Sequence, residues 1–181
     1  DVFFATYGHY FQMPNLNQMF FGTDYNLSGA YSIVGNPDLD AERTEAYELG
    51  VRHRLSDLSS VAVSAFSKDI TGLVRTREYE SESYDYYFLY ENDDSHGTIT
   101  GAEVKLLRLP GDVLSGSVGY TYSVARGRYS SPTEQFEYAQ QEMSIEPTRD
   151  SYLDWDQRHT ADAHVSVELG GGWGPRLAGV H

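Results

Sequence analysis

The chain has 181 residues, with 27 acidic and 13 basic side chains, a formal net charge of −14 and no Cys. The acidic balance argues against nucleic-acid binding, which needs a basic surface. The absence of Cys excludes a disulfide framework and any thiolate metal site. No stretch approaches about 18 consecutive apolar residues, so the sequence predicts no transmembrane helix. The length fits one domain or part of a larger one.

Both ends of the chain have the composition of strands. The chain begins at Asp1, not Met, and Val2–Tyr7 and Arg176–His181 already have strand character. We therefore expect a segment of a longer protein.

Strand signals recur along the chain, and helical periodicity is almost absent. Strands are expected at about 2–11, 44–55, 60–77, 97–109, 114–128, 158–169 and 176–181. In 158–169, Ala161, Ala163, Val165, Val167 and Leu169 fall on one face, whereas the other is polar, with Asp162, His164 and Glu168. Such alternation places one face in an apolar medium and the other in water. The pattern predicts an all-β, antiparallel up-and-down meander of about seven strands.

The links between these strands alternate in length. Short turns are expected at about 56–59, 110–113 and 170–175, and long loops at about 12–43, 78–96 and 129–157. A meander would gather the long loops at one end of the sheet, as transmembrane barrels do. A soluble all-β binding module, such as an adhesin or a carbohydrate-binding sandwich, is the alternative. Charges of both signs on the polar faces and aromatics near strand ends favour the barrel.

Residues 35–51 read Gly-Asn-Pro-Asp-Leu-Asp-Ala-Glu-Arg-Thr-Glu-Ala-Tyr-Glu-Leu-Gly-Val. This segment resembles the loop-to-strand signature in the C-terminal part of the barrel of TonB-dependent outer-membrane receptors, although Asp40-Ala41 replaces the family's usual Lys-Pro. Further motifs in the same order begin at Tyr7, Ala65, Thr100, Tyr120 and Asp154. The matching positions, for which structural roles are expected, are Asn36, Pro37, Leu39, Glu42, Tyr47, Glu48, Gly50, Gly101 and Glu103.

The resemblance implies a barrel of roughly 22 strands around an N-terminal plug, in the outer membrane of a Gram-negative-type bacterium. This chain would be a partial barrel, in contact with outer-membrane lipid, the remainder of its barrel and the plug. A TonB-type energising protein would act through an N-terminal region that this sequence does not contain. The implied function is energised uptake of a scarce solute, such as a ferric siderophore or another small-molecule or metal-chelate ligand, recognised by extracellular loops.

Two of the long links carry the candidate ligand contacts. Loop 78–91 is dense in Tyr and carboxylate, and Tyr combines rigid contact area with a polar tip. The competing interpretation is that these residues are strand ends that project beyond the membrane. The candidate ligand-binding residues are Tyr84, Tyr86, Tyr87, Tyr90 and Trp155.

We expect no catalytic residue, no metal ligand set and no cofactor. Asp154 and Asp156 would share one face of an extended chain, and paired carboxylates can hydrolyse glycosides. Nothing else in the sequence supports that hydrolase reading, and a hydrated acidic loop is the simpler explanation. The protein is expected not to be an enzyme.

Overall fold

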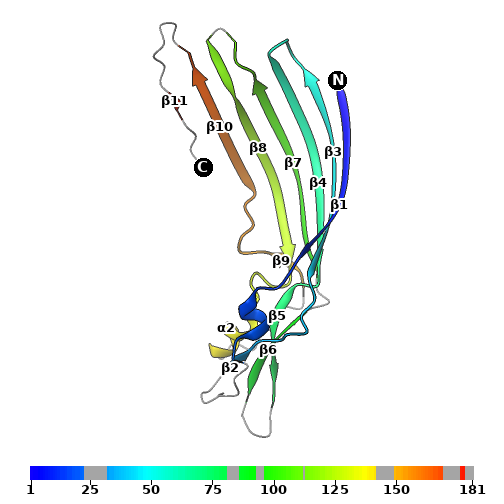
Figure 1. Cartoon of the computed structure of the whole chain (residues 1–181), viewed down its shortest axis with the longest axis vertical. Coiled ribbons are helices and arrows are strands. Elements are labelled where there is room, and N and C mark those ends of the chain that lie inside the picture. Colours follow the sequence, from blue (N-terminus) through cyan, green and yellow to red (C-terminus); the bar gives the residue numbers. More distant parts are fainter. Residues whose placement is uncertain are drawn as a thin grey trace.

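The computed structural model describes residues 1–22, 32–80, 86–92, 96–111, 113–141, 149–168 and 176–177. Its main feature is a tall, curved antiparallel sheet (Figure 1) in the order β1-β3-β4-β7-β8-β10-β11. The short strand β9 (Ser151–Tyr152) adds to β8. This confirms the predicted all-β meander of about seven strands. The strands along the sheet are β1 (Val2–Gln12), β3 (Glu42–Arg54), β4 (Ser59–Thr71), β7 (His96–Arg108), β8 (Leu114–Gly127), β10 (His159–Val167) and β11 (Arg176–Leu177).

The strand expected at 60–77 is divided in two. β4 ends at Thr71, and β5 (Val74–Tyr79) pairs in a second sheet, of order β2-β6-β5, with β6 (Tyr87–Asn92) and β2 (Ser32–Val34). Gly72 lies between the two strands with φ of 70°, a conformation that favours glycine. The Asn92 side chain donates hydrogen bonds to the Gly72 and Asp40 carbonyls, at 2.8 and 3.0 Å, and fixes this change of direction.

The second sheet and the helix α2 (Glu134–Gln140) form a small lobe at the end of the large sheet where the long links lie (Figure 1). Phe88 is fully buried there and meets the Phe136 ring edge to face, with ring centroids 5.2 Å apart. Val74 and Thr76 of β5 are buried beside it. We call β2, β5, β6 and α2 the lobe. Among the described strand residues, the buried apolar side chains are Val74 and Phe88 in the lobe and Ala125 in β8.

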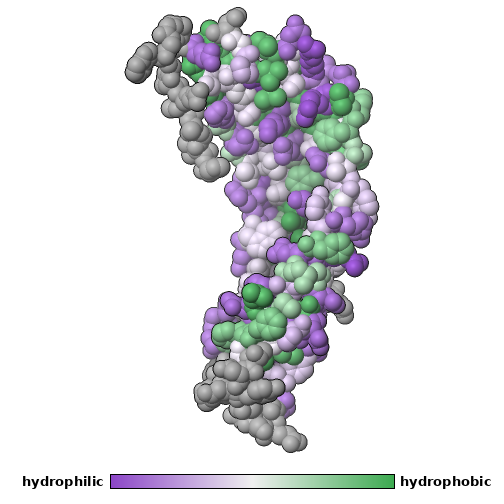
Figure 2. All heavy atoms as spheres, in the orientation of Figure 1, coloured by the Kyte–Doolittle hydropathy of each residue, from purple (hydrophilic) through white to green (hydrophobic). Residues whose placement is uncertain are grey.

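The large sheet leaves an apolar face exposed. The register places Leu49 opposite Ala65, Ala65 opposite Ala102, and Ala102 opposite Tyr122, so one row of side chains crosses four strands. Leu49 is 66% exposed and Val104 is 41% exposed. We call the face that carries this row of side chains the apolar face. Figure 2 shows apolar side chains on the surface of the molecule between polar ones.

The opposite face carries charges and is called the polar face. Glu48 pairs in register with Phe66, and Phe66 pairs with Gly101. Glu103 lies two residues further along β7 on the same side as Gly101. The helix α1 (Leu16–Phe20) follows β1 in the first long link. Neither α1 nor α2, the helices in the described ranges, is long and apolar enough to span a membrane.

Candidate ligand-binding cavity

A cavity of about 380 Å³ lies where the long links meet the ends of the large sheet. Its strand residues Gln12, Glu42 and Ile70 belong to the polar face by the pairing register. Segments widely separated in the sequence therefore converge on one side of the sheet. The lining residues are Gln12, Met13, Pro14, Asn15, Gln18, Glu42, Ile70, Leu73, Val74, Arg75, Gly97, Thr98, Ile99, Tyr129, Ser130, Ser131, Pro132, Leu153 and Trp155.

The first wall comes from the chain that leaves β1. Asn15 begins α1 with a capping box: its side chain accepts from the Gln18 amide, and the Gln18 side chain accepts from the Asn15 amide, both at 2.9 Å. These bonds satisfy amide groups that a helix start leaves without partners. Pro14 is buried, whereas Met13 is exposed. The caps hold a short, otherwise marginal helix at the cavity rim.

The second wall is polar and comes from the junction of β4 and β5. Arg75 donates to the Tyr129 hydroxyl at 3.1 Å and lies 5.4 Å from the centre of that ring. Glu42 accepts a hydrogen bond from the Val74 amide at 3.2 Å. A guanidinium, a phenol and a carboxylate are thus brought together from three segments.

The third wall is the link that follows β8. Leu153 is buried, and a Cβ added to Gly127 would lie 3.2 Å from its Cδ2 atom, so the small residue makes room for Leu153. Trp155 is 50% exposed and also lines the cavity. The Thr76 amide donates to the Pro132 carbonyl at 2.7 Å, which ties this link to the lobe.

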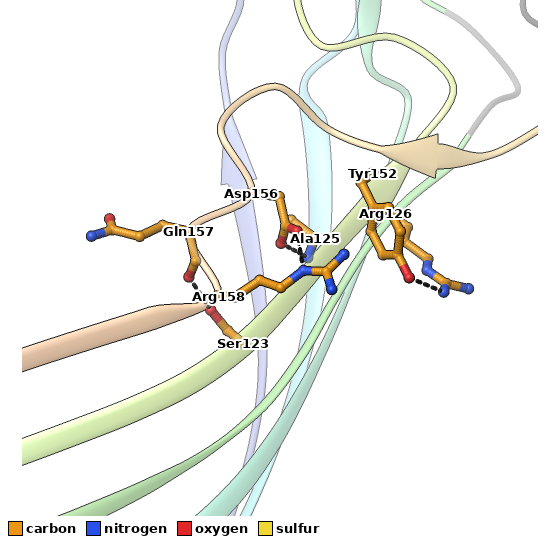
Figure 3. Close-up of polar contacts among 7 residues, drawn as sticks. All are labelled: Ser123, Ala125, Arg126, Tyr152, Asp156, Gln157 and Arg158. Carbon is orange, nitrogen blue, oxygen red and sulfur yellow. Dashed lines mark hydrogen bonds and ion pairs between the residues drawn. The ribbon is translucent and has the colours of Figure 1, made fainter.

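A polar cluster joins the start of β10 to the end of β8 (Figure 3). One oxygen of Asp156 accepts from the Ala125 amide at 2.7 Å, and the other lies 3.0 Å from Arg158 Nε. Arg158 lies 4.0 Å from the centre of the Tyr152 ring, and Arg126 lies 4.8 Å from it. Arg126 also donates to the Tyr152 hydroxyl at 2.9 Å.

The charges in this cluster reinforce one another. The Ala125 amide and then the Arg158 guanidinium hold the pKa of the Asp156 carboxyl below its ordinary range. The hydrogen bond from Arg126, together with Arg158, lowers the pKa of the Tyr152 phenol. Asp156 in turn raises the pKa of Arg158. The shifts of Asp156 and Arg158 both favour their ionised pair.

Acidification is expected to leave the Asp156 contacts intact until the pH falls below the ordinary carboxyl value of 3.8. Because the folded-state pKa is lowered, the stabilisation is complete above the ordinary value and is lost as the pH falls through the lowered one. Hydrogen exchange of the Ala125 amide, corrected for the intrinsic effect of pH, measures this in the full-length protein. Loss of protection of the Ala125 amide already at about pH 5 would contradict the role of the Asp156 carboxylate as its acceptor.

The candidate ligand residues are dispersed in the structure. Trp155 lines the cavity, but Tyr86, Tyr87 and Tyr90 do not, and Tyr84 lies outside the described residues. Tyr87 stacks on Tyr79 across the hairpin, with centroids 5.6 Å apart. Tyr90 lies in β6 on the opposite side of the hairpin, and burial raises its pKa. Within the loop expected at 78–96, the described residues include the end of β5 and all of β6, which pair as antiparallel strands.

Most of the cavity residues are not singled out by the sequence patterns, among them Met13, Arg75 and Tyr129. Met13 follows directly on the end of β1, Tyr129 lies two residues beyond β8, and Arg75 is the second residue of β5. Position at a strand end beside a long link is the signal that could have identified them, because binding residues often lie on loops carried by a rigid scaffold.

The signature residues of the first link make structural contacts. Asn36 donates to the Tyr90 carbonyl at 3.0 Å and accepts from the Asp38 amide, while Leu39 is buried and Pro37 is exposed. The Asn36 contact connects the first link to the lobe.

The signature residues on the strands divide between the two faces of the sheet. Tyr47 packs against Tyr7, with ring centroids 4.9 Å apart, on the apolar face. Gly50 lies under the Phe4 ring and Gly101 under the Phe66 ring. Glu48 and Glu103 are half-buried on the polar face.

Within the described ranges, no group of three or more His, Cys, Asp or Glu side chains is placed to hold a metal ion. Asp154 and Asp156 also differ in their surroundings, since both oxygens of Asp156 already have partners. The site offers aromatic faces, amides, a guanidinium and a carboxylate, which suit non-covalent binding of a polar ligand.

Comparisons with known proteins agree with this architecture. A solved structure entitled "Copper transporter OprC" superposes with a TM-score of 0.51 at 14% sequence identity, which shows likeness of fold alone. The match covers 93% of this chain and 22% of that one, so the chain spans about a fifth of that neighbour's length. No curated protein sequence matches the chain.

The family comparison covers almost the whole sequence. The model described as "TonB dependent receptor-like, beta-barrel" matches residues 2–180. Barrels of this family are transport receptors in the outer membrane of Gram-negative bacteria. The exposed apolar face is the surface that such a barrel presents to lipid. The chain belongs to the β-barrel family of TonB-dependent receptors.

Proposed function

We propose that this segment forms part of the ligand-recognition site of an energised outer-membrane transporter for a scarce solute, such as a ferric siderophore. The observation that supports this most directly is the cavity of about 380 Å³ on the polar face, at the end of the sheet with the long links. In a barrel of this kind the long links are extracellular and the polar face lines the lumen. The cavity would then open toward the path of the solute.

The lining supports a polar ligand with a flat or ring-shaped part. Trp155 and Tyr129 offer aromatic faces, Gln12 and Gln18 offer amides, and Arg75 offers a charged donor. A few convergent polar groups between aromatic walls are typical of small-molecule sites. The neighbour whose title names it a copper transporter is consistent with a metal or a metal chelate as the solute.

Replacing Trp155 by Ala in the full-length receptor is expected to weaken ligand binding about 30-fold, because an aromatic anchor contributes on the order of 2 kcal/mol to a binding site. Ferric hydroxamates and ferric catecholates are first supplied as the only iron source to cells that carry the receptor. The chelate that supports growth is then titrated against the purified protein. Uptake should also stop when the cytoplasmic membrane is depolarised, whereas binding should persist.

Tyr86→Ala is the comparison: Tyr86 is an exposed candidate aromatic that lies outside the cavity, so it should not contribute if the cavity is the recognition site. It should bind the chelate as the unaltered receptor does. Unaltered affinity in the Trp155→Ala protein, or a loss in Tyr86→Ala as large as that in Trp155→Ala, would place the recognition site outside the cavity. Failure of every iron chelate to support growth would remove the siderophore as the solute.

A further inference from the structure

We infer that Asp156 is a positioning residue for the cavity: its carboxylate fixes the chain from Tyr152 to Arg158, and so sets the position of Trp155. The consequence for ligand binding rests on the proposed function. The positioning itself rests only on the contacts of this chain.

The first step is a gap in the hydrogen-bond ladder along the edge of β8. β10 pairs with β8 as far as His159 opposite Tyr122, and the Ser123 amide then donates to the Arg158 carbonyl at 3.1 Å. The ladder resumes at Arg126, which lies opposite Tyr152 in β9. Between these points the chain departs from the edge, and the Ala125 amide needs another acceptor.

Asp156 supplies that acceptor from its side chain. Its carboxylate accepts a hydrogen bond from the Ala125 amide at 2.7 Å (Figure 3). The Ala125 carbonyl accepts from the Leu153 amide at 3.2 Å. The Asp156 amide also donates to the Leu153 carbonyl at 2.8 Å, which closes a turn over residues 153–156. Trp155 lies inside this turn, so the turn fixes the backbone from which its ring reaches the cavity.

The second carboxylate oxygen ties the turn to the cluster outside it. It accepts from Arg158, whose guanidinium lies against the Tyr152 ring, and Arg126 contacts the same ring. The side chain of Asp156 is only 8% exposed, so water competes little for these bonds. Asp156 thus connects Tyr152 and Arg158, the two ends of the segment that leaves the edge of β8, to each other and to β8.

The two oxygens can be tested separately. Asp156→Asn keeps one acceptor for the Ala125 amide, but its NH₂ group cannot accept from Arg158. Asp156→Ala removes both contacts. Asp154→Ala is the matched control, because the Asp154 side chain makes no hydrogen bond or ion pair within the described ranges, and the hydrogen bond from its backbone amide to Ser130 is retained.

The first measurement needs no ligand. Acrylamide quenching of the full-length receptor, with and without an added Trp155→Phe change, isolates the signal of Trp155 by difference. Trp155 is half-exposed, so its release should raise the accessibility of the ring about twofold in Asp156→Ala, less in Asp156→Asn and not at all in Asp154→Ala. The mobility of unheated protein in SDS gels verifies that each barrel is folded. Unchanged quenching in a folded Asp156→Ala protein would overturn the inference.

The second measurement separates this inference from the proposed function. Chelate affinity should fall about tenfold in Asp156→Ala, as a misplaced anchor loses part of its contribution. Increased quenching with unchanged affinity would support the positioning role and refute the cavity as the recognition site. Unchanged quenching with reduced affinity would refute the positioning role and leave the cavity supported.

Discussion

Replacing Phe88 by Ala is expected to unfold the lobe while the large sheet stays paired. Phe88 is fully buried, and its ring meets Phe136 of α2 edge to face. Truncation of a buried Phe to Ala costs about 3–5 kcal/mol, through lost burial and the cavity left behind. The lobe has few other buried apolar residues, so a loss of this size is comparable to its whole stability.

The lobe then ceases to support the ligand cavity. β5 carries Val74 and Arg75 into the cavity wall, and the Thr76 amide holds the Pro132 carbonyl of the opposite wall. Hydrogen exchange and limited proteolysis of the full-length receptor in detergent measure the effect. Amides of β6 should lose protection, while those of β4 and β7 should keep it.

Phe21→Ala provides the control for Phe88, since Phe21 is 59% exposed. It should leave the exchange of β6 unchanged. If Phe88→Ala also left β6 protected, the lobe would not depend on this core. If β4 lost protection too, the lobe and the large sheet would be one cooperative unit.

Much of the large sheet could be predicted because its signal is local. Side chains alternate with a period of two wherever one face is apolar and the other polar, as in β8, where Val118, Tyr120 and Tyr122 alternate with Gly119 and Thr121. The break between β4 and β5 has no such local signal. It depends on Gly72 and on bonds from Asn92, 20 residues away, so the sequence predicts one continuous strand.

The cavity was the harder part to predict because its walls are distant in sequence. Arg75 and Tyr129 are 54 residues apart, and no periodicity relates them. Trp155 could be proposed because an aromatic in a long link is a plausible contact. Asp154 and Asp156 look equivalent in the sequence, and only the ladder gap at Ala125 distinguishes them. The gap arises where the chain between β9 and β10 leaves the edge of β8. The alternation of polar and apolar residues does not show where that happens.

Gly101→Ala is expected to reduce the folded fraction of the receptor severely. A Cβ at this position would lie 2.5 Å from Phe66 Cζ and 2.5 Å from the carbonyl oxygen of Tyr122. Extra atoms in a well-packed site usually cost about 1–3 kcal/mol. The cost here should reach the upper part of that range, because the oxygen belongs to the backbone of β8 and cannot move without disturbing the ladder.

Gly97→Ala is the matched control on the same strand. Its added Cβ would meet no heavy atom closer than 3.6 Å, which is ordinary contact. Urea titration in detergent, followed by the mobility of unheated protein in SDS gels, should show a lower midpoint for Gly101→Ala and little change for Gly97→Ala. Equal midpoints would mean that the sheet adjusts freely at Gly101.

A double change identifies which neighbour makes glycine necessary at position 101. Phe66→Ala removes the ring that covers Gly101 but leaves the Tyr122 oxygen in place. If the ring were the obstacle, Phe66→Ala would restore the stability of Gly101→Ala. We expect no such rescue, because a ring can rotate or shift at modest cost, whereas the backbone oxygen is held in register by the pairing of β7 with β8. Gly101 would then be required by the close approach of two strands, and the aromatic cover would be a consequence of that glycine.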